Sequence, residues 1–318
     1  MFIKLKLIIK ALRIYLYDLR NDIRYTTLAT GKLSSQEKLL SSLVVATHTI
    51  EKGLTMPNKR IPFGEAKAVE IVHDCNSYIE KGYDTSESRF QSVLSTMSEY
   101  RITCGGGGIF QGLFDDIKLL EKFIKIPIVS QKYNINQEDY FSHTKDDFKK
   151  FSESRYSCRN LTGHVDDSIL QDALSLSMRA PSTCNRQSHR VHLLQSSESK
   201  RIILSIQSGN RGFGDLADQF ILVTSDLSDW PGMHQRNAPY VDGGIYLMNL
   251  LYCLHYFDIA ACTLNLYLDT DRTKRMYEGL GIPRNEVPIA LVAIGMPPEH
   301  FDLACSHRRN VIEIISHH

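Results

Sequence analysis

The chain has 318 residues, of which 42% are hydrophobic and 23% are charged. A chain of this length can bury one large core or two modest ones, so we expect two domains. Its 37 basic and 36 acidic residues give a formal net charge of +1. This balance excludes the broad positive field of a nucleic-acid-binding protein, and we expect no nucleic acid partner.

The seven cysteines are spread along the chain without a CxxC pair, unlike those of a disulfide framework or a zinc site. We therefore expect no bound metal and a reducing, cytoplasmic location. No apolar run approaches the ~20 residues that a membrane-spanning helix requires, and no segment has the pattern of a cleaved signal peptide.

The amino terminus predicts a basic amphipathic helix from Phe2 to Leu19, because apolar side chains share this segment with lysines and arginines. Two interpretations stay open. Such a helix commonly packs on its own domain, but it can also lie on an anionic membrane surface. In the second case residues 1–20 form a peripheral membrane contact.

Two further helices are expected in the first half. Ser34 to Lys52 begins with an N-cap serine at 34 or 35 and ends before Gly53, and Glu65 to Lys81 ends before Gly82. The first half therefore reads as mostly helical.

A domain boundary is expected near the middle of the chain. Ordering the glycines Gly105 to Gly108 costs much backbone entropy, so we expect a flexible connector there, with a mobile lid or hinge as the alternative. The polar stretch Gln131 to Lys150 separates two halves of different pattern. We predict a helical amino-terminal domain over residues 1–145 and a second domain over 146–318.

The second half mixes one amphipathic helix with short apolar runs. Asp166 to Arg179 is expected as a helix that Pro181 prevents from continuing. The strand candidates are Val191 to Leu194, Phe220 to Thr224, Ile259 to Thr263 and Pro288 to Ile294.

The segment Asp242 to Phe257 is apolar around almost its whole circumference, so as a helix it needs cover on every side. A single domain of this size seldom supplies such cover, whereas a dimer interface does. We expect Asp242 to be the N-cap of this helix.

Several segments occur in an order that resembles the flavin-dependent nitroreductase family. They are SRYSCRN (Ser154–Asn160), APSTCNRQ (Ala180–Gln187), GNRGFG (Gly209–Gly214), the buried helix, IAACTLN (Ile259–Asn265), and VPIALVAIGMPP followed by a basic tail with Arg308 and Arg309. The resemblance covers about Glu153 to the end. It implies an α+β fold with a small antiparallel sheet flanked by helices, a domain-swapped homodimer, FMN as cofactor and NAD(P)H as co-substrate.

The phosphate of FMN is a dianion that requires arginine or lysine, and Arg155 with Arg308 or Arg309 can clamp it. In extended backbone Arg155, Ser157 and Arg159 fall on one face, a spacing that can follow a phosphate and ribityl chain. The resemblance implies that Arg159 lies near the pyrimidine edge of the flavin, where it would help to set the redox potential. The carboxy-terminal register leaves Arg308 and Arg309 as alternatives.

The resemblance also implies cofactor-binding residues on three loops. They are Pro181, Ser182, Thr183, Asn185, Gln187, Asn210, Arg211, Thr263, Leu264 and Asn265. The residues before 188 would reach the cofactor bound mainly by the other subunit. Asn210 would hydrogen-bond the flavin with Arg211 beside it, and the residues after 262 would approach the flavin face through backbone groups. A strand over 311–315 is expected to join the partner subunit's sheet.

His48 and Glu51 stand one helical turn apart in HTIEKGL and suit either an acid/base pair or a surface or interdomain hydrogen bond. We name no catalytic acid or base, because a flavin cofactor itself carries out the chemistry.

The implied activity is a ping-pong hydride transfer from NAD(P)H through FMN to an electron-poor small molecule. Two alternatives stay open. One is a flavin-dependent dehydrogenase or oxidase of a small molecule or modified peptide, and the other is a membrane-peripheral, non-catalytic flavin-binding scaffold. The physiological substrate is not readable from the sequence.

Overall fold

The computed structural model describes residues 2–105, 110–125 and 132–318. Of the expected glycine connector, only Gly105 lies among them. The chain forms two compact units. The first comprises Met1–Thr55, Lys59–Tyr133 and Ala304–His318, and the second comprises Met56–Asn58 and Asn134–Leu303. The domain boundary at residue 145 stays a prediction.

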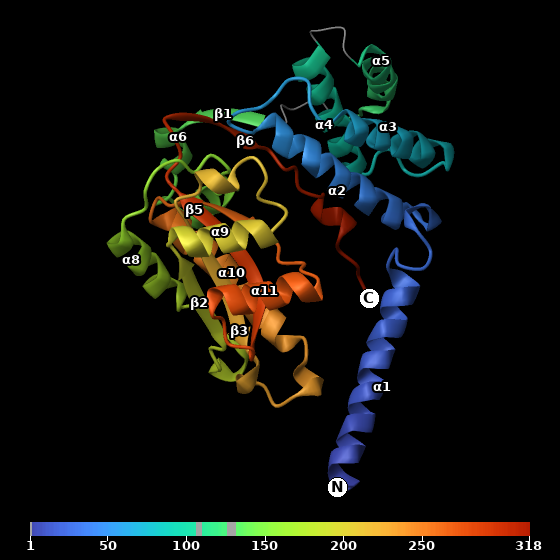
Figure 1. Ribbon diagram of the computed structural model, residues 1–318. Coiled ribbons are helices and arrows are strands. Elements are labelled where there is room, and N and C mark those ends of the chain that lie inside the picture. The colour runs from blue at the N-terminus through green and yellow to red at the C-terminus, as the bar shows by residue number, and fades with distance from the viewer. Residues whose placement is uncertain (1, 106–109, 126–131) are drawn as a thin grey trace. The chain divides into compact units, whose positions relative to one another are not determined.

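The first unit is helical, as expected (Figure 1). Its described elements are α1 (Phe2–Tyr25), η1 (Lys32–Ser34), α2 (Gln36–Leu54), α3 (Glu65–Glu80), α4 (Ser88–Cys104), α5 (Gln111–Leu120), η3 (Glu121–Phe123) and η8 (Val311–Glu313). Helices α2 to α5 enclose a core in which Leu43, Ile71 and Phe90 are fully buried. None of the described helices is long and apolar enough to cross a membrane.

Local sequence explains where α2 begins but not where it ends. Ser35 is the N-cap, and its side chain accepts a hydrogen bond from the Lys38 amide at 3.3 Å. The expected stop before Gly53 is wrong, because α2 continues to Leu54. Gly53 has a packing role instead: a Cβ there would lie 2.1 Å from Cε2 of Phe63.

The second unit is built on a four-stranded antiparallel sheet of order β2-β3-β5-β4. Its strands are β2 (His189–Leu194), β3 (Gln219–Asp226), β4 (Ala260–Leu264) and β5 (Glu286–Gly295). The α+β class and the expected strands are confirmed. A smaller sheet pairs β1 (Lys132–Asn136) with β6 (His300–Ala304).

Helices cover both faces of the large sheet. The helices are α8 (Asp167–Ser177) and α10 (Ala238–Tyr256) on one face, and α9 (Ser197–Ile206) and α11 (Thr270–Leu280) on the other. Side chains alternate along β3, so Phe220 and Leu222 pack in the cluster with α9 and α11 while Ile221 and Val223 pack with α8 and α10. The connecting elements are α6 (Gln137–Phe141), α7 (Phe148–Ser154), η4 (Thr183–Asn185), η5 (Gly214–Leu216), η6 (Leu227–Asp229) and η7 (Met233–Gln235).

Two local predictions in this half need comment. Helix α10 begins at Ala238 with Asn237 as its N-cap residue, so the prediction of Asp242 as N-cap is wrong. The segment expected as a strand over 311–315 contains the 3-10 helix η8 in this chain. Pro239 explains the early start of α10, because proline suits the first turn of a helix, where no amide partner is needed.

Candidate functional site

The segment SRYSCRN runs beside β4. The Cys158 amide donates a hydrogen bond to the Ala261 carbonyl at 3.0 Å, and the Cys158 side chain is fully buried. Tyr156 packs in the same hydrophobic cluster as Cys158. In extended backbone successive side chains point to opposite sides. Tyr156 and Cys158 point toward the hydrophobic cluster, so the alternating residues Arg155, Ser157 and Arg159 fall on the other side.

Arg159 is a buried cation that forms no ion pair with the acidic residues that the structure describes. It is 8% exposed, and its Nε has no hydrogen-bond partner among the described residues. The side-chain oxygen of the next residue, Asn160, is buried and unpaired in the same way. Unpaired buried polar groups lower the free energy of unfolding. We therefore expect a ligand or a second chain to supply partners for Arg159 and Asn160.

Arg155 lies half-buried near a neutral histidine. Burial lowers the pKa of His255 from 6.5 to about 4, and the positive charges of Arg155 and Lys145 act in the same direction. Nε2 of His255 lies 2.8 Å from Oγ of Ser154. The imidazole is therefore uncharged at neutral pH and adds no second positive charge beside Arg155.

The loop before β2 has a strained backbone. Cys184, Asn185 and Gln187 have positive φ angles of 53°, 56° and 53°. This left-handed conformation costs roughly 1 kcal/mol or more for residues other than glycine. Pro181, Asn185 and Gln187 are exposed, so the loop presents these predicted residues at the surface.

Asp242 holds the strained loop in place. Both its carboxylate oxygens accept hydrogen bonds from Thr183, one from the amide and one from the hydroxyl, each at 2.8 Å. Asp242 is 3% exposed within α10. Inside the loop, the Gln187 amide donates to Oγ of Ser182 at 3.0 Å. In the sequence Asp242 stands out as an acidic residue within an otherwise apolar helix, but nothing there identifies Thr183 as its partner.

The GNRGFG loop is tied to the end of β4. Nδ2 of Asn210 donates to the Gln207 carbonyl at 2.7 Å, and Nε2 of Gln207 donates to the Asn265 carbonyl at 3.1 Å. Gln207 is 4% exposed, and its Oε1 has no partner among the described residues. Sequence reasoning missed Gln207, because its partners are backbone groups that leave no pattern in the sequence. Arg211 and Thr263 are exposed, and Leu264 is buried.

The predicted residues of the second unit fall into two groups. Those around SRYSCRN, Gln207 and Asn265 lie by β4, whereas the Thr183 loop precedes β2. The strand order places β2 and β4 at opposite edges of the sheet. Three strand spacings separate these edges by about 14 Å. One chain therefore does not bring both groups together at a single point of its sheet.

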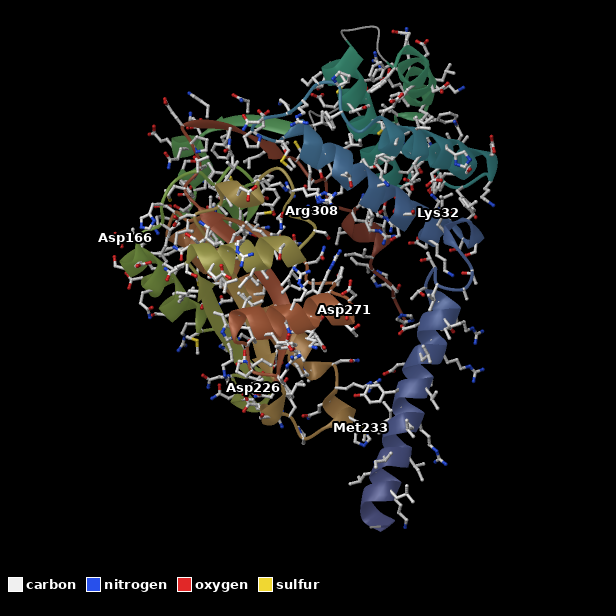
Figure 2. The ribbon with its side chains drawn as sticks, viewed as in Figure 1. Lys32, Asp166, Asp226, Met233, Asp271 and Arg308 are labelled. Atoms are coloured by element: carbon white, nitrogen blue, oxygen red, sulfur yellow. The ribbon has the colours of Figure 1, made fainter. Side chains whose placement is uncertain are left out.

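The two carboxy-terminal arginines differ in their surroundings, and both belong to the first unit. Arg309 lies among carboxylates, with its Nε 3.2 Å from Glu313 and 3.7 Å from Glu87. Arg308, labelled in Figure 2, is exposed and donates to the Ser306 carbonyl, and it forms no ion pair with the described acidic residues. The geometry therefore favours Arg308 as the guanidinium that is free to bind an anion.

HTIEKGL anchors this carboxy-terminal segment. Oε1 of Glu51 accepts a hydrogen bond from the Ser306 amide at 2.7 Å, and Oε2 lies 3.0 Å from Nδ1 of His48. Burial alone would raise the pKa of Glu51, but these hydrogen bonds outweigh it and the pKa lies below its ordinary value. Both carboxylate oxygens of Glu51 have hydrogen-bond partners, which supports the hydrogen-bond interpretation rather than the acid/base pair.

A cavity of about 590 Å³ is lined by residues of β2, α9 and α11 and their flanking loops, and none of the predicted site residues is among them. Within the described residues, no group of histidine, cysteine, aspartate and glutamate side chains is arranged to hold a metal ion.

The chain was compared with known proteins. It matches no protein-family model and no curated protein. Solved structures match about half of it. A nitroreductase family protein of Clostridium difficile is 23% identical with a TM-score of 0.45 and covers 54% of this chain and 97% of its own. A nitroreductase with bound FMN from Desulfitobacterium hafniense is 21% identical with a TM-score of 0.41, covering 53% and 96%.

Proposed function

We propose that this chain is an FMN-dependent oxidoreductase that works as a homodimer. It would accept hydride from NAD(P)H and pass it to an electron-poor small molecule. The observation that carries the proposal is Arg159, a buried guanidinium with an unpaired Nε inside a motif that resembles a flavin site. The Nε–H of Arg159 lacks an acceptor, and the carbonyl and ring-nitrogen acceptors at the pyrimidine edge of a flavin would supply one.

The residues present fit FMN in kind. Arg155 and Ser157 would hold the phosphate end. Arg159 would face the pyrimidine edge of the flavin. Gln207 adds an unpaired acceptor beside the Asn265 carbonyl and can receive a donor from the ring.

Bound FMN would supply hydride acceptance and donation, and the protein would supply charge and position. The positive charge of Arg159 would favour the reduced, anionic flavin. At about 4 Å and an effective dielectric constant of about 20, one such charge is worth about 4 kcal/mol. The Thr183 loop, fixed by Asp242, would contact the cofactor bound by the partner subunit.

Two observations support a homodimer. The candidate residues lie at opposite edges of the sheet, so a second copy is needed to join them. One face of α10 also leaves apolar side chains uncovered, with Val241 58%, Ile245 41% and Met248 38% exposed. We expect Ile245→Glu to give a monomer by light scattering and to release flavin. Ile102→Glu, which changes an exposed isoleucine of α4 in the first unit, is the control and leaves the dimer intact.

The cofactor assignment is tested by the colour of the purified protein. We expect yellow protein that releases FMN on denaturation, and largely colourless protein for Arg155→Ala. Arg201→Ala is the matched control, because Arg201 is an exposed arginine of α9 paired with Glu198. Equal flavin content in Arg155→Ala and the parent would refute the phosphate assignment.

The direction of the reaction is tested separately by product analysis with and without NAD(P)H. Turnover that requires NAD(P)H supports the reductase. Reduction of the flavin by the substrate alone would identify the dehydrogenase or oxidase. Bound flavin that is bleached neither by NADH or NADPH nor by any substrate tested would favour a non-catalytic scaffold. Membrane contact is a separate proposal and depends on α1 alone.

A further inference from the structure

Helix α1 exposes a continuous apolar face (its side chains are drawn in Figure 2). A helix turns by about 100° per residue, so apolar residues spaced three or four apart gather within about a third of the circumference. Each is between 43% and 61% exposed: Leu5, Ile8, Ile9, Leu12, Tyr15, Leu16, Leu19 and Ile23. Soluble monomers rarely expose a continuous apolar patch of this kind to water, so we expect another protein or a membrane to cover this face.

Basic side chains flank one edge of this apolar face. They are Lys6, Lys10, Arg13, Arg20 and Arg24, and all of them are exposed. The sequence of α1 holds six basic and two acidic residues, a net charge of +4 in a chain whose formal total is +1. Helix α1 therefore carries a local excess of positive charge beside its exposed apolar face.

We propose that α1 binds the surface of an anionic lipid bilayer. The apolar face would enter the headgroup boundary, and the basic flank would meet the lipid phosphates. A helix with these two faces lies in the plane of the interface rather than crossing it. The finding that α1 is too polar to span a membrane agrees with this placement.

The obvious rival occupant is α1 of a second copy, paired as a coiled coil. In that register Leu5, Leu12 and Leu19 alternate with Ile8 and Tyr15 along the seam, and the next seam position is an aspartate. On one side of the seam, the positions that usually carry pairing charges hold Ile9, Leu16 and Ile23 instead. Two-helix pairing would leave these side chains uncovered, whereas a bilayer surface covers the whole face.

The test is co-sedimentation of the full chain with vesicles. We expect binding to vesicles of phosphatidylcholine and phosphatidylglycerol in equal parts, weakened by salt, and far less binding to phosphatidylcholine alone. Leu16→Glu should weaken binding by about tenfold or more, because it places a charge in the apolar face. Tyr17→Glu is the matched control: the residue is as exposed, at 64% against 61%, and the charge change is identical.

Tyr17 lies on the basic side of α1, so Tyr17→Glu should lose only the electrostatic share, about a few-fold. Circular dichroism checks that both variants keep the helix. Failure of the full chain to bind anionic vesicles, or equal losses in the two variants, would overturn the proposal. A change of oligomeric state in Leu16→Glu without a change in vesicle binding would overturn it in favour of a second copy.

Discussion

The two units differ in how many of their described buried polar side chains lack a hydrogen-bond partner. In the first unit, the buried Gln91 uses both ends of its amide, and Lys32 (Figure 2) lies 2.6 Å from the buried Asp74. Among the described residues, Thr47 provides the only unpaired buried side-chain oxygen or nitrogen there. In the second unit such atoms recur, on Arg159, Asn160, Arg186, His189, Gln207, Gln219, Trp230, Gln235 and His255.

This difference shows where binding is expected. A core in which almost every described buried polar side chain has a partner needs no ligand to complete it, so we interpret the described core of the first unit as a scaffold. Unpaired groups gathered in the second unit cost stability until a ligand or second chain satisfies them. This conclusion concerns only the core of the first unit and does not extend to α1, which contributes no residue to that core.

The largest effect is expected from breaking the satisfied core. In the parent chain the Gln91 side chain forms hydrogen bonds of 2.6 to 2.9 Å with the carbonyls of Thr85 and Phe123 and with the Lys125 amide. Gln91→Leu leaves these three backbone groups without that partner. We expect a loss of about 4 kcal/mol in the free energy of unfolding, since each stranded group costs roughly 1 to 3 kcal/mol.

Denaturant unfolding followed by circular dichroism measures this loss. Gln235→Leu is the control, because Oε1 of Gln235 is already unpaired within the described structure, and we expect it to cost less than about 1 kcal/mol. Similar losses in both variants would remove the contrast between the units.

The next effect is a pH dependence specific to the second unit. Because burial lowers the pKa of His255 from 6.5 to about 4, the unfolded chain binds a proton in this range that the folded chain does not. Stability should therefore fall as the pH drops from 6.5 to about 4, by roughly 1 kcal/mol per pH unit.

His255→Gln should flatten this fall, and His234→Gln, at an exposed position, should not. Fluorescence of Trp230, the single tryptophan, reports the unfolding of this unit. An unchanged slope in His255→Gln would mean that other groups cause the pH dependence.

The smallest effect concerns the strained loop. Thr183→Val removes one of the two hydrogen bonds to Asp242, whereas Thr183→Ser keeps both. A double-mutant cycle of Thr183→Val with Asp242→Asn should show a coupling of about 1 kcal/mol. Additive effects, or equal damage from Thr183→Ser, would show that Asp242 does not position the loop.

Much of the fold was readable from the sequence, because period-two apolar runs and N-cap residues are local signals. The strands from β2 to β5 and the cap Ser35 follow from them. The role of Asp242 was not readable, since its partner Thr183 lies 59 residues away. The contrast between Arg308 and Arg309 depends in the same way on carboxylates brought close by folding.

The central claim is that the buried guanidinium of Arg159 binds FMN. Arg159→Leu tests it most directly. We expect FMN affinity to fall by about a hundredfold, while the unfolding free energy of the apoprotein stays the same or rises, because an unpaired buried charge has been removed. Unchanged FMN affinity together with a less stable apoprotein would contradict the account, since Arg159 would then be a structural residue.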